Sequence, residues 1–264
     1  NFNNFFTKMV KNFVRVIPKK GGEKWPGKLG EMSSLFSEAE YEMVKQGYRK
    51  AAIIHIDEHN YQQMTEKMNK DGLIFTPFLK SGHYEGFSHC HKEVKPGEPY
   101  YWYGCLTKTY KDAQEFKRAD GTVNGKNTDH KKYGEMLGYP ECCSSYFIKA
   151  FPKNYDPIWL EKQGEVSGYP ECNQMLRYFG ARITSHFSCS PNCKKTWEIG
   201  QKWLSVMKGI DKKLTEELYD LLNSNCSWNT YHGVVQVETP YFIGLTHTFP
   251  LLKKPRIINW KKEK

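Results

Sequence analysis

The sequence Gly-Tyr-Pro-Glu-Cys stands at residues 138–142 and again at 168–172, and a third Pro-x-Cys follows at 191–193. Proline is tolerated in the first turn of a helix, because the backbone N–H that it lacks would have no partner there. Each copy therefore predicts a cysteine at the start of a helix. Cys143 and Cys193 begin runs of apolar residues at three- and four-residue spacing, so we expect both side chains to point into the protein.

The chain before these motifs has an α/β pattern. Apolar runs at 51–56 and 73–78, with a helical segment at 58–70 between them, predict a strand–helix–strand unit. A helix over 37–49 precedes this unit. We expect residues 1–30 to be irregular, because Pro and Gly interrupt them, and residues 81–126 to form long loops in which 100–103 is the one strand-like run.

The pattern changes after these loops. It is helical from 129 to 223, and strand-like runs at 232–237 and 241–246 predict a closing β-hairpin. The predicted fold class is therefore α+β. It combines an α/β part with long loops at 1–126 and a helical, cysteine-rich part with a terminal hairpin and a basic tail at 127–264.

Composition describes a folded chain of one or two domains. Of the 264 residues, 39% are hydrophobic and 15% aromatic, far more than a disordered chain carries. No apolar run reaches the length of a membrane helix, and the N-terminus lacks the charged-then-apolar order of a signal peptide. We therefore expect a cytoplasmic protein with no membrane partner. The first residue is not Met, so the alternative that a leader peptide was removed stays open.

The formal charge of +10 comes from the two ends. Residues 1–50 hold 10 basic and 5 acidic side chains, residues 251–264 hold 6 and 1, and the body between is balanced. Any attraction to a polyanion is therefore predicted at the termini. The tail 253–262 places Trp260 among cations, as single-strand binders do, but a solvated terminus would look the same.

The densest group of possible metal ligands combines the two helix starts. Its members are Cys142, Cys143, His186, Cys189 and Cys193. A thiol at a helix N-terminus has a lowered pKa, which favours the thiolate that metals require. Four thiolates suit a [4Fe–4S] cluster or a zinc ion.

Two plainer explanations stay open, namely buried apolar cysteines and disulfides. Between the metals we favour iron–sulfur over zinc, because adjacent thiolates reach neighbouring irons more easily than one ion. Cys172 is expected to be a free thiol beside the site, because four ligands are available without it.

The cysteine motifs resemble those of a family. Leu-Gly-Tyr-Pro-Glu-Cys-Cys at 137–143, Leu-Arg-x-Phe-Gly at 176–180 and His-x-x-Cys-Ser-x-x-Cys at 186–193 are similar to the signature of an uncharacterised archaeal, bacterial and phage family, catalogued as a domain of unknown function. The resemblance implies that these cysteines and His186 form the functional centre. Less specifically, the adjacent pair is similar to that of the cluster-binding epoxyqueuosine reductases, whose Cys-x-x-Cys partner is absent here.

Other polar residues are weaker candidates. His55 and His59 would share a helix face, and a loop carries four further possible ligands, namely His83, His89, Cys90 and His91. The plainer reading is a hydrogen-bonded turn for the first pair and exposed side chains for the loop. Asn173 and Arg177 are predicted on one helix face. Arg177 and Arg182 would position an anionic substrate, or form surface ion pairs.

Two functions follow from the sequence. The first, which the aromatic content and the long loops favour, is an iron–sulfur or other metal-dependent enzyme. It would act by redox or Lewis-acid chemistry on a small or nucleic-acid-derived anionic substrate, with His186 as a ligand or proton donor. The second is a binding module in which the same cysteines hold a structural zinc and the basic termini bind nucleic acid.

Overall fold

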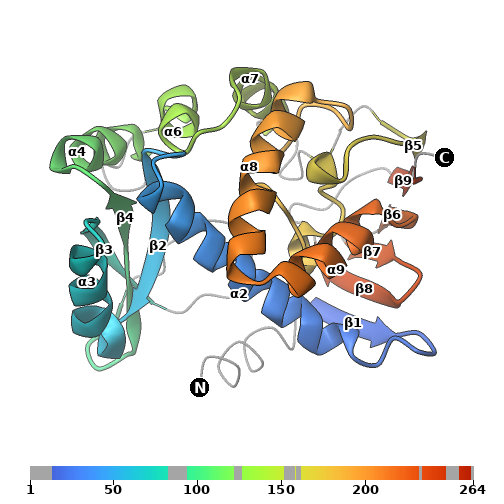
Figure 1. The fold of residues 1–264 in the computed structure, drawn as a ribbon, viewed down its shortest axis with the longest axis horizontal. Helices are drawn as coiled ribbons and strands as arrows, with labels where there is room; N and C mark the ends of the chain where they lie inside the picture. The colour runs from blue at the N-terminus through green and yellow to red at the C-terminus, as the bar shows by residue number, and fades with distance from the viewer. Residues whose placement is uncertain are drawn as a thin grey trace. The chain divides into compact units, whose positions relative to one another are not determined.

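The computed structural model describes residues 14–82, 94–121, 127–151, 158, 162–231, 234–247 and 256–262. Its helices and strands confirm the α+β class (Figure 1). In chain order they are β1 Val14–Pro18, α2 Trp25–Lys45, β2 Ala51–Asp57, η1 Glu58–Asn60, α3 Tyr61–Lys70, β3 Ile74–Gly82, β4 Tyr100–Thr107, α4 Tyr110–Ala119, α6 His130–Met136, α7 Glu141–Ala150, β5 Gly164–Val166, η2 Pro170–Cys172, η3 Arg177–Phe179, α8 Lys194–Ile210, α9 Lys212–Asn223, β6 Cys226–Tyr231, β7 Val234–Glu238, β8 Phe242–His247 and β9 Arg256–Trp260.

The chain forms two compact units. One is the continuous segment 40–144, and the other combines 1–39 with 145–264. These units do not follow the predicted boundary at 126/127. The reason is that β1 pairs with β8, which brings the N-terminal segment into the sheet of the C-terminal half.

The continuous unit is built on a three-stranded sheet in the order β2-β4-β3. The predicted strand–helix–strand unit is present as β2, α3 and β3, with β4 between the two strands and antiparallel to both. An apolar cluster containing Met68 of α3 covers one face, and a second cluster containing Phe116 of α4 covers the other. The strand-like run predicted at 100–103 is confirmed as the first half of β4, whereas the prediction of loops is wrong for 104–107 and for α4.

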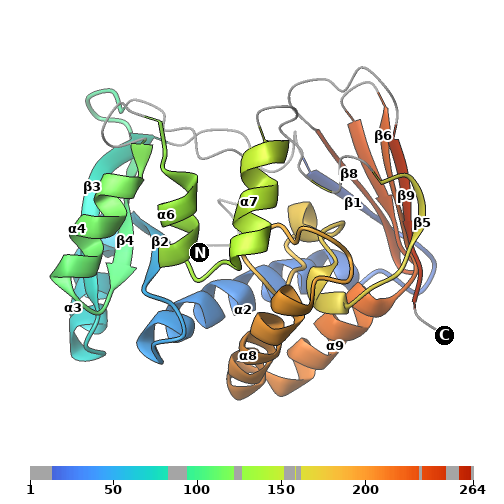
Figure 2. The same cartoon turned by 90° about the horizontal axis from the view of Figure 1, so that it is seen from above.

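The discontinuous unit contains a six-stranded sheet, seen edge-on in Figure 2, in the order β1-β8-β7-β6-β9-β5. The predicted hairpin is confirmed as β7 and β8, although it is only the middle of this sheet. All pairs are antiparallel except β5 with β9. Helices α8 and α9 lie side by side in both views.

Two terminal expectations are corrected. Residues 14–18 and 25–30 are not irregular, because they belong to β1 and to α2; the turn at 19–24 between them is irregular as expected. Pro26 lies in the first turn of α2, where it is tolerated, and Trp25, Leu29 and Met32 are buried at helical spacing. Nor is 256–260 a solvated tail, because β9 joins β6 and buries both Arg256 and Trp260.

No helix in the described part of the chain is both long enough and apolar enough to cross a membrane.

Candidate metal centre

The first Pro-x-Cys begins a helix as predicted. Helix α7 starts at Glu141, directly after Pro140, so its first turn carries both Cys142 and Cys143. Cys142 is exposed and Cys143 is buried, with 1% of its surface accessible. Their Sγ atoms are 3.8 Å apart. The inward position expected for Cys143 is therefore confirmed, and its neighbour directs its sulfur toward the same point.

The third Pro-x-Cys precedes α8. Cys193 is the N-cap residue of this helix rather than a member of its first turn, and its backbone N–H donates to the Ser190 carbonyl at 3.3 Å. Cys193 is buried, as predicted, and Cys189 is half-buried. This turn brings the sulfurs of a Cys-x-x-x-Cys close together without requiring them to share a helix.

The two cysteine pairs form one group. The Sγ atoms of Cys142, Cys143, Cys189 and Cys193 all lie within 4.8 Å of one another, so the group could hold a metal ion. Helix α7, which carries the first pair, is one continuous helix over Glu141–Ala150. The remainder of α7 is attached to the segment of the second pair, because the ring of Phe147 stacks on that of Phe187 at 6.1 Å and 17°.

The second Gly-Tyr-Pro-Glu-Cys does not begin an α-helix. It forms the three-residue η2, and its backbone lies against the Cys-x-x-x-Cys turn. The N–H of Tyr169 donates to the Pro191 carbonyl at 3.1 Å. A Cβ on Gly168 would lie 2.1 Å from that carbonyl oxygen, so only glycine fits this close approach. The second copy therefore braces the turn that carries Cys189 and Cys193.

Cys172 lies beside the group and outside it. It is a fully buried free thiol, as expected from the sequence. Its Sγ donates to the Cys193 carbonyl at 3.7 Å, and its own carbonyl accepts from the Ser188 hydroxyl at 3.0 Å. Burial raises the pKa of this thiol to about 12. Its contacts are those of a residue that holds the backbone of the turn.

The histidine of the predicted site is close to the cysteines in sequence but does not belong to the four-sulfur group. His186 is 4% exposed, and its Nε2 lies 2.9 Å from Oγ1 of Thr196 in the first turn of α8. This contact attaches the His186 segment to the helix that starts at Cys193. Its proposed role as a ligand or proton donor stays a prediction.

Both predicted arginines contact aromatic rings. The guanidinium of Arg177 lies 3.8 Å from the ring centre of Phe187, and that of Arg182 lies 4.0 Å from the ring centre of Phe36. The predicted helix face shared by Asn173 and Arg177 is wrong, because the chain there forms two short 3₁₀ turns. Asn173 is buried and donates to the Leu222 carbonyl at 2.7 Å.

The remaining histidine candidates are not brought into a described metal group. His55 lies in β2 and His59 in η1, so the expected helical pair is wrong. The side chain of His59 is 82% exposed. The loop candidates His83, His89, Cys90 and His91 lie outside the described residues.

Sequence reasoning missed the brace around Pro191 and the Phe147–Phe187 stack. The glycine repeated at position 168 was the available signal for the close contact with Pro191. A sequence alone does not distinguish a glycine required by such a close backbone approach from a glycine required by a turn. Comparison with family models, with curated proteins and with solved structures finds no match for this chain. The four-sulfur group and its surroundings therefore carry the functional argument.

Proposed function

We propose that this protein is a nucleic-acid-binding module organised around one structural zinc ion held by Cys142, Cys143, Cys189 and Cys193. The observation that carries the proposal is the mutual 4.8 Å limit on the four Sγ atoms. A Zn–S bond of about 2.3 Å gives a tetrahedral S···S edge of about 3.8 Å. The Cys142–Cys143 separation of 3.8 Å equals that edge.

The same distances favour zinc over the [4Fe–4S] cluster expected from the sequence. The thiolates of a cubane bind four different irons, so their sulfurs stand further apart, at about 6 Å. A group whose sulfurs all lie within 4.8 Å would have to open to receive a cluster. The adjacency of Cys142 and Cys143 does not oppose zinc, because the first turn of α7 already brings their sulfurs together.

Four thiolates complete the coordination of zinc, and this favours a structural role over an enzymatic one. A catalytic zinc keeps an open position for water or substrate, whereas a structural zinc is closed by four protein ligands. When bound, such an ion links helix starts and supplies folding free energy. Support for a nucleic-acid partner comes from the net charge of +10.

Metal analysis of protein purified with and without oxygen tests the centre. We expect one zinc per chain, a colourless protein, and replacement by Co²⁺ with the strong visible absorption of a tetrahedral thiolate complex. Chelation should lower the melting temperature, because the ion binds only the folded chain. Anaerobic protein that is brown, with four irons per chain and broad absorption near about 400 nm, would instead support the hypothesis of an iron–sulfur enzyme.

A further inference from the structure

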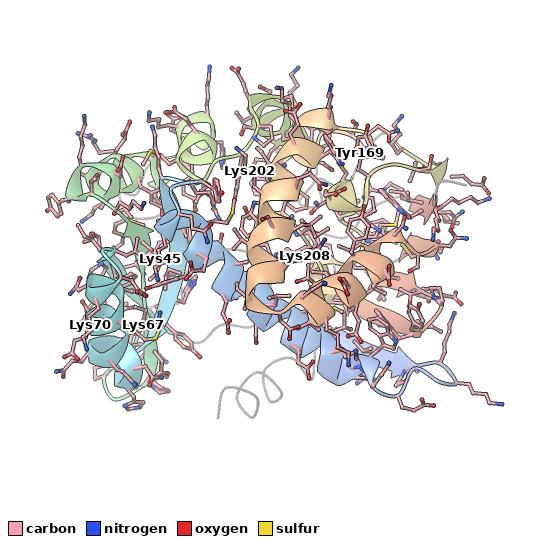
Figure 3. The ribbon with its side chains drawn as sticks, in the orientation of Figure 1. Lys45, Lys67, Lys70, Tyr169, Lys202 and Lys208 are labelled. Carbon is pink, nitrogen blue, oxygen red and sulfur yellow. The ribbon has the colours of Figure 1, made fainter. Side chains whose placement is uncertain are left out.

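The exposed face of α8 begins at the cysteine centre and is basic. Its exposed side chains include four lysines, Lys194, Lys195, Lys202 and Lys208. One acidic residue shares this face, Glu198, which pairs with Lys195 at 3.2 Å. Figure 3 shows Lys202 and Lys208 along the helix. From Lys194 to Lys208 the face extends about 21 Å at a helical rise of about 1.5 Å per residue.

Two aromatic rings lie at the end of this face nearest the cysteines. Trp197 is 37% exposed, and its ring centre is 5.9 Å from that of Tyr169. Figure 3 shows Tyr169 beside the N-terminal half of α8. Its backbone is fixed to Pro191, and the N–H of Trp197 donates to the Cys193 carbonyl at 3.0 Å. The rings are thus attached to the metal-binding turn.

We propose that this face of α8, with Trp197 and Tyr169 at its end, binds single-stranded nucleic acid; the inference rests on the proposed function and names its binding surface and its partner. Lysines along a helix match the phosphates of a polyanion, and a fixed, partly exposed ring gives an unpaired base a surface on which to stack. Bases of a duplex are already stacked, so the rings favour a single strand over a duplex.

This surface replaces the tail expected from the sequence. In β9 the ring of Trp260 is 1% exposed, which leaves no face for a base. The count of basic and acidic residues over 51–250 did not indicate the lysines of α8, because acidic residues elsewhere in that segment balance their charge. Their arrangement on one helix face appears only when the exposed residues of α8 are separated from the buried ones.

The test measures binding of the zinc-loaded full chain to a fluorescent oligothymidine and to a duplex of equal length over a range of salt concentrations. The first variant changes Lys194, Lys202 and Lys208 to Gln. Its control changes Lys24, Lys70 and Lys111 to Gln, three exposed lysines outside α8, so both variants carry the same charge. We expect at least tenfold weaker single-strand binding for the first variant and a slope of log affinity against log salt that is shallower by about 2.

The second variant, Trp197→Ala, isolates stacking. Affinity for the single strand should fall about 5- to 150-fold with an unchanged salt slope, and Trp197→Phe should retain most of it. Equal losses in the α8 and control variants, or equal affinity for duplex and single strand, would overturn the inference. Zinc content, measured on every variant, separates the two proposals. If the α8 variants keep full zinc occupancy and bind the single strand as the unmodified protein does, only the proposed binding surface is rejected. If the unmodified protein contains no zinc, the proposed zinc centre is rejected.

Discussion

The two copies of Gly-Tyr-Pro-Glu-Cys have the same sequence and opposite environments. In the first copy Glu141 is 79% exposed and Cys142 is exposed, and a ten-residue helix follows. In the second copy Glu171 is 1% exposed and Cys172 is fully buried, and the helix ends after three residues. One copy carries two of the four clustered cysteines, and the other holds the turn that carries the remaining two.

The residue after the repeat accounts for the difference. Cys143 continues into α7, whereas Asn173 accepts a hydrogen bond from the Met175 N–H at 3.0 Å and donates to Leu222 of α9. Asparagine favours such local turns over a continued helix, because its side chain competes for backbone groups. A short repeat therefore specifies how a helix starts, and its next residue decides whether the helix goes on.

The largest expected effect separates the two cysteines of the repeat. Cys142→Ser and Cys143→Ser should each lose the bound zinc and lower the free energy of unfolding by more than about 3 kcal/mol, because a structural ion supplies folding free energy. Cys172→Ser should keep one zinc per chain. Metal content and thermal unfolding measure both effects. Zinc loss from the Cys172 variant, with retention in either of the others, would show that the two copies exchange roles.

A smaller effect separates the two glycines. Gly168→Ala should shift the Pro191 backbone, because the new Cβ would meet its carbonyl oxygen, and should weaken zinc binding together with stability. Gly138 has φ of +71°, so Gly138→Ala should cost about 1–2 kcal/mol in conformational strain. We expect that variant to bind zinc with near-normal affinity. Competition with a zinc-binding dye compares the zinc affinities of the two variants. Equal affinities would contradict the role of the Gly168–Pro191 contact in holding the turn.

The smallest effect separates the two glutamates. Burial against α8 raises the pKa of Glu171, so the folded state disfavours its ionised form. The folded protein is then penalised as pH rises from the ordinary glutamate pKa through the raised one, and the penalty is absent below that window. Relative to Glu171→Gln, the unmodified protein should lose melting temperature as the pH rises above the ordinary glutamate pKa of about 4.3.

Glu141→Gln is the matched control for this pH effect. Its carboxylate is exposed and pairs with Lys131 at 3.5 Å, so the substitution should leave the pH profile of melting nearly unchanged. A profile for Glu171→Gln that runs parallel to that of the unmodified protein would contradict the proposed cost of ionising Glu171.

The sequence predicted what depends on local pattern. The start of α7, the inward position of Cys193 and the β7–β8 hairpin follow from proline position and apolar spacing. Prediction from the sequence failed where pairing with a distant segment decides the structure of a residue or strand. Pairing of β1 with β8 cannot be read from either strand, and the burial of Trp260 depends on the pairing of β9 with β6. The sulfur distances on which the zinc proposal rests cannot be obtained from the spacing of the cysteines along the chain.

The pairing of Val14 with Thr246 also bears on the order in which the two units can fold during synthesis. Residues 40–144 are continuous and can fold as they leave the ribosome, whereas the six-stranded sheet must wait for its last strands. Cys142 and Cys143 emerge before Cys189 and Cys193, so a nascent chain presents two adjacent thiols without their partners. The zinc site proposed above would therefore be complete only after residue 193 has been added.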